Sequence, residues 1–358
     1  MSKCCKSIIC VLVFFFFIGI ASVPVGAEEV KGAKKTISVL IPGNEKDNGF
    51  MEAAYRGYSK IKENLPVNVS YVSNISATSD EKLLTEALRK LAQAKPEMII
   101  AHGGQCNAPV KIIAAEFPEI KFVVIQGNVK GENISSYTVN QEQSAWLAGA
   151  LAGLSTKTNV VGHISGAWPN PGLRARAAFY DGLRHTNEKA VFLTWFTGNL
   201  DDSAINKKAA EAQIAKGSDI IYTMLNGGRI GVIDAMKSTG GKVKGIGNVI
   251  DWTKVDPKVF IGSAVADASV AIFNAASDFV EGHWKANEVR EIGIEQPDVV
   301  NLTMSKKVPS SVQKKIAELA QKIKSGEIKI NTVYEGKEFN PATGEFVDQS
   351  FKETLKKK

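Results

Sequence analysis

Short apolar segments alternate with amphipathic helical segments along almost the whole chain, and this alternation limits the fold more than any other feature. Thr36–Ile41 is rich in β-branched residues and ends at Pro42-Gly43, which predicts a buried strand that enters a loop. The segment 81–94 places its leucines on one helical stripe behind Asp80, a good helix cap. Apolar strands that alternate with such helices predict parallel sheets covered on both faces. We therefore expect an α/β fold.

The alternation predicts about ten strands, enough for two doubly wound sheets. In the first half we expect strands at 36–41, 69–72, 98–101 and 122–126, and helices at 51–64, 81–94 and 110–116. In the second half we expect strands at 160–164, 191–196, 220–224, 243–247 and 260–265, and helices at 145–154, 172–184, 203–215, 229–238, 268–280 and 310–325. Doubly wound sheets bind ligands outside the carboxyl ends of their strands, so a site is expected in the loops that follow the strands.

Residues 1–27 have the three parts of a secretory signal peptide. Lys3 and Lys6 form a basic start, an apolar run follows at 8–21, and Val25-Gly26-Ala27 is a small-residue cleavage site. We predict cleavage before Glu28 and a periplasmic mature protein. An uncleaved membrane anchor is the alternative, but the apolar run is short for a membrane span.

The cysteines and the charge exclude further classes of protein. Cleavage would remove Cys4, Cys5 and Cys10 and leave Cys106, so we expect no internal disulfide and no zinc cluster. A lipid anchor is not favoured, because none of the three early cysteines stands at the end of the apolar run. The formal charge of +7 lies partly in the signal segment and in the lysine-rich end at 351–358. The body is therefore close to neutral, and no nucleic-acid partner is expected.

Polar and aromatic residues follow the predicted strands of the first half. The first loop carries Asn48 and places Phe50 at the start of a helix, where the ring either packs in the core or faces a ligand. The third strand runs into His102-Gly103-Gly104-Gln105, whose glycines allow close backbone approach and whose side chains offer donors and acceptors. Gln126 follows the fourth strand. The G-x-G-x-x-G fingerprint of dinucleotide sites is absent.

The loops of the second half carry similar groups. Trp168 stands among prolines after the first strand of this half, where a large ring is costly unless it covers something. Later loops carry Asn199, Asn226, Asp251 and Trp252. Stacking surfaces with a few convergent hydrogen-bonding groups suit a flat, uncharged heterocycle.

The chain offers little support for catalysis. Its four histidines are far apart and lack metal-ligand spacing, and neither a G-x-S-x-G elbow nor a supported Cys/His pair is present. His163 lies within a predicted strand, so we expect a core residue. Asp202 precedes a predicted helix, and a capping role is the simpler interpretation. We therefore predict no catalytic residues, no metal and no cofactor.

Five segments occur in an order and spacing that are typical of one family. They are Asp47-Asn48-Gly49-Phe50, Glu116–Phe122, Tyr137 with Trp146–Gly149, Phe179–Leu183 and Asn226-Gly227-Gly228. From Thr36 to about Leu302 the chain resembles the basic membrane protein, or PnrA-like, family of ABC-transporter solute-binding proteins.

The resemblance implies a type I periplasmic-binding-protein fold, with two lobes joined by three crossovers and a ligand cleft between them. The expected first lobe is 36–138 plus 264–290, the second is 139–263 plus 291–345, and 346–358 is a basic tail. The implied protein is a monomer without enzymatic activity. Its implied partners are a small-molecule ligand and an ABC permease and ATPase in the inner membrane.

Family members with known ligands mostly take purine nucleosides or nucleobases, and this chain keeps only part of the family pattern. The family aromatic matches Phe50, but Gln126 replaces a common acid, Leu200 beside Asn199 replaces an aromatic, and the usual late lysine falls near Ala266. Charged groups of this kind typically hold ribose hydroxyls. The resemblance therefore favours a purine base first and a nucleoside second.

Two other functions stay open. A ligand sensor for a membrane signalling partner would have the same sequence features. An exported nucleoside or sugar hydrolase would need a carboxylate cluster or metal site in one loop, and no loop shows one.

Overall fold

Six parallel strands form the first sheet of the computed structural model, which describes residues 34–75 and 80–349. The predicted signal segment 1–27 lies outside the described residues. The spatial order is β11-β5-β4-β3-β1-β2. The strands are β1 (Thr36–Leu40), β2 (Asn68–Val72), β3 (Met98–His102), β4 (Lys121–Ile125), β5 (Ile134–Val139) and β11 (Val289–Ile292).

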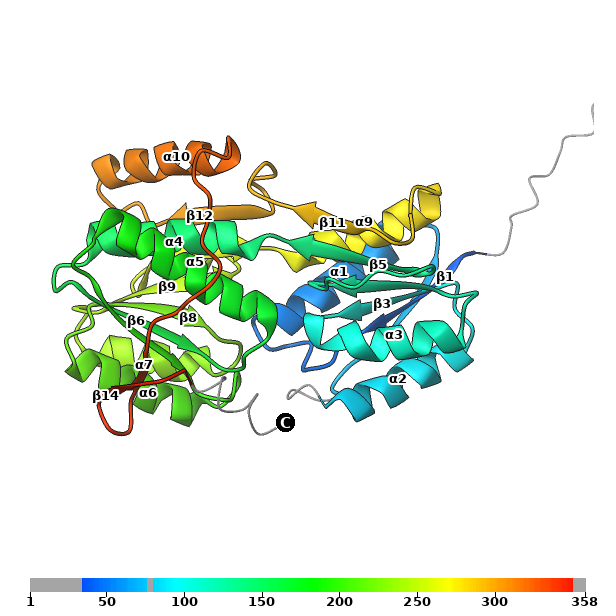
Figure 1. The fold of residues 1–358 in the computed structure, drawn as a ribbon, viewed down its shortest axis with the longest axis horizontal. Helices are drawn as coiled ribbons and strands as arrows, with labels where there is room; N and C mark the ends of the chain where they lie inside the picture. The colour runs from blue at the N-terminus through cyan, green and yellow to red at the C-terminus, as the bar shows by residue number, and fades with distance from the viewer. Residues whose placement is uncertain (1–33, 76–79, 350–358) are drawn as a thin grey trace, which may run out of the picture. The chain divides into compact units, whose positions relative to one another are not determined.

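Helices cover both faces of this sheet (Figure 1). They are α1 (Phe50–Asn64), α2 (Glu81–Gln93), α3 (Asn107–Glu116) and α9 (Ala268–Glu281). Successive strand residues point to opposite faces, so Val39 and Val123 pack with α1 and α9, whereas Leu40 and Val124 pack with α2 and α3. We call this sheet with its four helices the first lobe.

The second sheet has the order β12-β10-β9-β8-β6-β7, and β12 alone among these strands is antiparallel to its neighbour. Its strands are β6 (Val160–Ser165), β7 (Val191–Phe196), β8 (Ile220–Met224), β9 (Lys244–Val249), β10 (Phe260–Ala266) and β12 (Val300–Met304). Its helices are α4 (Gln141–Ser155), α5 (Asn170–Thr186), α6 (Ser203–Ala215), α7 (Arg229–Ser238), α8 (Trp252–Val255) and α10 (Ser310–Lys324). Val161 and Tyr222 pack with α4 and α5, whereas Ile164 and Ile221 pack with α6 and α7. We call this sheet with its helices the second lobe.

The chain changes sheet three times: between β5 and β6, between β10 and β11, and between β11 and β12. The expected return of the chain to the first lobe covers residues 264–290. β10 continues in the second sheet to Ala266, and α9 then packs against α1 of the first lobe.

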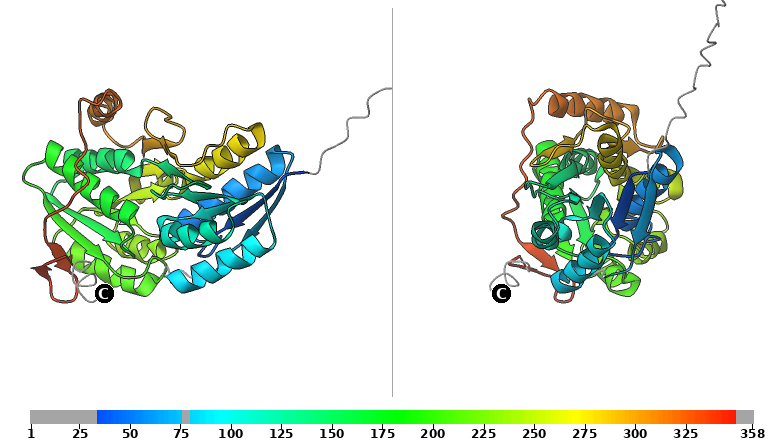
Figure 2. Two further views of the ribbon diagram at one scale, coloured as in Figure 1. Left: turned by 45° about the vertical axis from the view of Figure 1, so that its right-hand side comes forward. Right: turned by 90° about the vertical axis from the view of Figure 1, so that its right-hand side faces the viewer.

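After α10 the chain crosses the second lobe and forms a small hairpin of β13 (Glu338–Asn340) and β14 (Glu345–Val347) (Figures 1 and 2). The start of the expected basic tail at 346 falls inside β14, and Gln349 is buried.

The close packing of α4 against α5 in the second lobe depends on two glycines. A Cβ at Gly149 of α4 would lie 1.9 Å from the carbonyl oxygen of Phe179, and one at Gly182 of α5 would lie 2.0 Å from that of Trp146. Trp146 Nε1 also donates to the Asp181 carboxylate at 2.8 Å. Two of the family-like segments thus form a helix contact.

Candidate functional site

The loops after β1 and β8 join the carboxyl edges of the two sheets. The backbone N–H of Phe50 donates to Asn226 Oδ1 at 3.3 Å, and Arg229 Nη1 donates to the carbonyl oxygen of Asn48 at 3.3 Å. A Cβ at Gly49 would lie 2.5 Å from Asn226 Oδ1, so only glycine allows this approach. Two of the predicted site residues, Asn48 and Asn226, therefore take part in the contact between the lobes.

Asp47 holds the start of α1. Its carboxylate accepts from the backbone N–H groups of Gly49, Met51 and Glu52 at 2.8, 3.1 and 3.0 Å. A carboxylate at a helix N-terminus satisfies N–H groups that have no partner within the helix. Burial nevertheless raises the pKa of Asp47 above its usual range, against the effect of these hydrogen bonds.

Arg229 is a buried cation of the second lobe that bonds the loop that contains this acid. Its guanidinium is buried over the ring of Trp252, 4.3 Å from the ring centroid, and it donates to Thr223 Oγ1, the Leu225 carbonyl oxygen and Asn248 Oδ1. Burial lowers the pKa of Arg229 to about 9, and the charge of Asp47 partly opposes this shift. Neither Asp47 nor Arg229 is among the residues predicted for the site, although the polar loop before α1 and an arginine at the start of a helix are visible in the sequence.

The ring of Phe50 packs against the ring of His102 in a tilted arrangement. The ring centroids are 4.0 Å apart at an interplanar angle of 32°, and His102 Nε2 lies 2.9 Å from the carbonyl oxygen of Phe50. Because a carbonyl oxygen only accepts, Nε2 carries the proton and Nδ1 is an acceptor, which is buried without a partner. Burial lowers the pKa of His102 to about 3, so the ring is neutral. Phe50 itself is half-buried.

Trp168 lies on the second lobe, half-buried between β6 and α5. Its ring centroid is 6.2 Å from that of Phe196 at the end of β7. The indole Nε1–H is buried and has no hydrogen-bond partner among the described residues. An unpartnered buried donor is costly, so Trp168 is a candidate to meet an acceptor that belongs to a ligand.

Four other predicted site residues use their side chains for hydrogen bonds within the protein. Gln126 bonds the N–H and carbonyl of Val139 with its two amide atoms, at 2.5 and 3.1 Å. Asn199 Oδ1 accepts from the N–H groups of Asp201 and Asp202. Asp251 caps α8 and accepts from Thr303 Oγ1 at 2.7 Å, while Trp252 is buried and donates to the Asn248 carbonyl oxygen.

Gln105 lies half-exposed in the turn after β3, against the backbone of Gly103. A Cβ at Gly103 would lie 2.3 Å from Gln105 Oε1, and its φ of 103° also requires glycine. The structure thus places Phe50 against His102, and Gln105 lies in the turn that follows His102 on the first lobe.

The simpler interpretations of two other residues are confirmed. Asp202 caps α6 through the N–H groups of Ala204 and Ile205. His163 is a buried core residue that bonds Thr194 Oγ1 at 2.8 Å.

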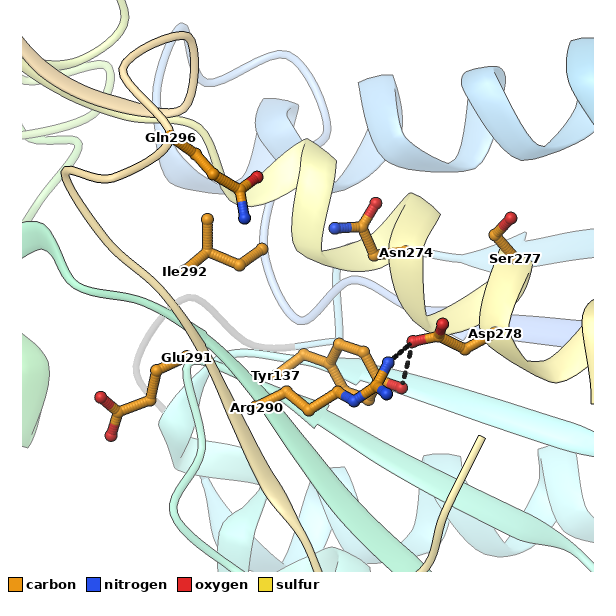
Figure 3. Close-up of a pocket in the computed structure, with 8 residues that line it drawn as sticks. All are labelled: Tyr137, Asn274, Ser277, Asp278, Arg290, Glu291, Ile292 and Gln296. Atoms are coloured by element: carbon orange, nitrogen blue, oxygen red, sulfur yellow. Dashed lines mark hydrogen bonds and ion pairs between the residues drawn. The ribbon is translucent and has the colours of Figure 1, made fainter. Parts of the chain in front are cut away.

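A pocket of about 380 Å³ lies elsewhere on the first lobe, between β5, α9 and β11 (Figure 3). Arg290 and Tyr137 both bond the carboxylate of Asp278 there, Tyr137 at 2.7 Å. None of the predicted ligand residues lines this pocket. We therefore do not assign the site to it.

Within residues 34–75 and 80–349, three or more acidic, His or Cys side chains are nowhere grouped so that they could hold a metal ion. Cys106 is buried, and burial raises the pKa of its thiol to about 12, so it is unreactive at neutral pH. No helix in the described part of the chain is both long and apolar enough to cross a membrane.

Comparison with known proteins gives consistent results. Residues 34–333 match the model of the family described as "ABC transporter substrate-binding protein PnrA-like". Basic membrane protein B of Borreliella burgdorferi is 23% identical over 274 residues, which cover 74% of this chain and 80% of that protein.

Two solved structures also superpose on most of the chain. One is an ABC transporter solute-binding protein from Aeropyrum pernix, with a TM-score of 0.74, 20% identity, and 84% of this chain and 94% of that chain covered. The other is a transcriptional activator of the comK gene from Bacillus halodurans, with a TM-score of 0.66 and 25% identity. This superposition covers 82% of this chain and 98% of that chain.

Proposed function

Because the chain belongs to the PnrA-like family of ABC-transporter substrate-binding proteins, we propose that it is an exported receptor for a purine base. The family comprises binding proteins rather than enzymes, and its partners are a small molecule and the membrane components of a transporter. The two sheets and the solved relatives confirm the predicted type I periplasmic-binding-protein fold. Purine nucleosides are the second choice of ligand.

The observation that carries the ligand class is the Phe50–His102 pair at the carboxyl edge of the first lobe. A flat heterocycle can stack on a half-buried aromatic ring, which is worth about 1–3 kcal/mol per base in nucleic-acid binders. The acceptor His102 Nδ1 and the donor Trp168 Nε1 are both buried without partners. Purine bases carry both ring acceptors and N–H donors, so they could meet groups of both kinds.

In this proposal Phe50, His102, Gln105 and Trp168 contact the base, while Asn48 and Asn226 join the lobes around it. Gln126, Asn199, Asp251 and Trp252 serve the protein's own structure and are not part of the proposed ligand set. The protein acts as a monomer that closes by hinge motion and delivers the base to an ABC permease and its ATPase.

Calorimetry with adenine, guanine, hypoxanthine and guanosine tests the ligand class. We expect Phe50→Ala to weaken binding of every purine by about tenfold to a hundredfold, because the stacking surface is lost. Leu83, which is 45% exposed on α2, provides the control: Leu83→Ala should bind as the parent does. If no purine binds the parent, or if Phe50→Ala binds equally well, the ligand proposal is wrong.

Export is tested on the mature protein. Cleavage at the predicted site gives Glu28 as the first residue, which mass spectrometry of the periplasmic fraction would detect. A retained Met1 or a lipid on a cysteine would contradict this location.

A signalling role is the second candidate, favoured by the similarity to the transcriptional activator of comK from Bacillus halodurans. Deleting a co-encoded permease distinguishes the two functions. Purine uptake is lost if the protein serves transport, whereas a ligand-dependent transcriptional response survives if it serves signalling.

A further inference from the structure

A buried guanidinium in the second lobe is neutralised by the end of the chain. Arg176 of α5 is 1% exposed, Glu338 of β13 is 0% exposed, and Arg176 Nη1 lies 3.2 Å from Glu338 Oε1. The ring of Tyr334 lies 4.2 Å from the guanidinium carbon, and Arg176 Nη2 donates to Gln349 Oε1 at 3.5 Å. Removing one partner of a buried ion pair is strongly unfavourable, so Arg176 and this part of the chain depend on each other.

The acidic partner comes from a segment, 334–349, that lies beyond the residues matched by the family model. Hydrogen bonds join the two ends of this segment, since Gln349 Nε2 donates to the carbonyl oxygens of Tyr334 and Gly336 at 2.8 and 2.9 Å. Phe339 is buried, and β13 packs beside β7, the edge strand of the second sheet. Figures 1 and 2 show this end of the chain, in red, lying against the second lobe.

Arg176 connects this segment to Trp168 through one aromatic ring. The guanidinium carbon lies 5.1 Å from the ring centroid of Phe196, and the Phe196 centroid lies 6.2 Å from that of Trp168. Arg176 is also in the second turn of α5, the helix that follows the Trp168 loop directly. Glu338 can therefore influence Trp168 both through the Phe196 ring and through the start of α5.

We propose that Glu338 is a positioning residue for Trp168, so that segment 334–349 forms the outer support of the ligand-binding wall of the second lobe. This inference rests on the proposed function for the role of Trp168 as a ligand contact. A side chain in a binding site needs neighbours that fix its rotamer, and the Glu338–Arg176 pair fixes the ring behind Trp168.

The first experiment needs no ligand, because it measures the surroundings of the indole. Trp168 fluorescence is obtained as the difference between each protein and its Trp168→Phe counterpart, with acrylamide as quencher. We expect Glu338→Gln and Glu338→Ala to raise the quenching constant of Trp168 while the far-ultraviolet circular dichroism stays unchanged. Glu335→Gln, an exposed acid in the same segment, should leave Trp168 as it is in the parent.

A double variant separates positioning from stability alone. Arg176→Met with Glu338→Met removes both buried charges and keeps apolar bulk, which often restores stability. We expect its melting temperature to recover while Trp168 remains accessible and adenine and guanine bind about tenfold more weakly. If Trp168 is as protected as in the parent in all these variants, or recovers together with the melting temperature, Glu338 has no positioning role.

The two proposals fail in different ways. Loss of Trp168 protection in the Glu338 variants supports the positioning role even if the parent binds no purine. Absence of purine binding by the parent would overturn only the proposed ligand. Purine binding by the parent with Trp168 unchanged in the Glu338 variants would overturn only the positioning role.

Discussion

At the scale of single residues, two buried histidines contribute to the pH dependence of stability. His102 has an ordinary pKa of 6.5 in the unfolded chain and a pKa lowered by burial to about 3 in the fold. His163 is shifted in the same direction by burial and by the charge of Arg176. Below pH 6.5 the unfolded state binds more protons, so stability is fully present above this pH and falls as the pH is lowered toward 3.

Each buried histidine should therefore lower the free energy of unfolding by about 1.4 kcal/mol for every pH unit below its unfolded pKa. Urea denaturation between about pH 7 and pH 5 measures the slope. His102→Gln should reduce it, whatever it does to the absolute free energy of unfolding. Because burial raises the pKa of Asp47 and so acts in the opposite direction, lower pH values are less informative.

At the scale of elements, the contact between α4 and α5 is set by backbone proximity. A methyl group at Gly149 would meet backbone atoms of Phe179 and Leu183, at 1.9 and 2.8 Å, which cannot move without displacing a helix. We expect Gly149→Ala to lower the free energy of unfolding by about 1–3 kcal/mol, measured by urea denaturation.

Gly172 on α5 provides the matched control, because a Cβ there would meet only the Pro169 ring at 3.6 Å. Gly172→Ala should leave the free energy of unfolding unchanged or raise it by about 0.4–1 kcal/mol, since alanine restricts the unfolded chain. If both variants unfold at the same urea concentration as the parent, the close helix contact is not needed for stability.

At the scale of the whole described chain, the direct contacts between the lobes govern closure. Asn226 and Arg229 of the second lobe bond backbone groups of Phe50 and Asn48 of the first. We expect Asn226→Ala to enlarge the radius of gyration of the ligand-free protein in X-ray scattering, because the N–H of Phe50 loses its partner. A saturating purine should reduce the radius of gyration of the parent.

Ile230 lies 58% exposed on α7, close to these residues in sequence, and supplies the control. Ile230→Ala should scatter as the parent does. An unchanged radius of gyration for Asn226→Ala, or no compaction of the parent with ligand, would show that these hydrogen bonds do not control a hinge.

The sequence by itself determined the alternating elements and several local contacts. The bounds of β7, α6, β8 and α7 match the expected ones, and Asp80 and Asp202 cap the predicted helices. These features depend on neighbouring residues, through hydrophobic periodicity and hydrogen bonds within one turn, so they can be read locally. The resemblance between ordered segments then gave the family and the fold.

Only the tertiary structure determined that β5 is a strand and which partners many polar side chains bond. β5 contains Ser135 and Ser136, which conceal its burial, and it exists because β4 and β11 flank it. Gln126, at φ 56°, turns back to Val139, and Asp251 turns to Thr303, 52 residues later in the chain. Arg176 acquires its carboxylate from Glu338, 162 residues away. Hydrogen bonds and ion pairs of this kind depend on which distant segments of the chain come into contact. The local periodicity of the sequence does not predict these contacts.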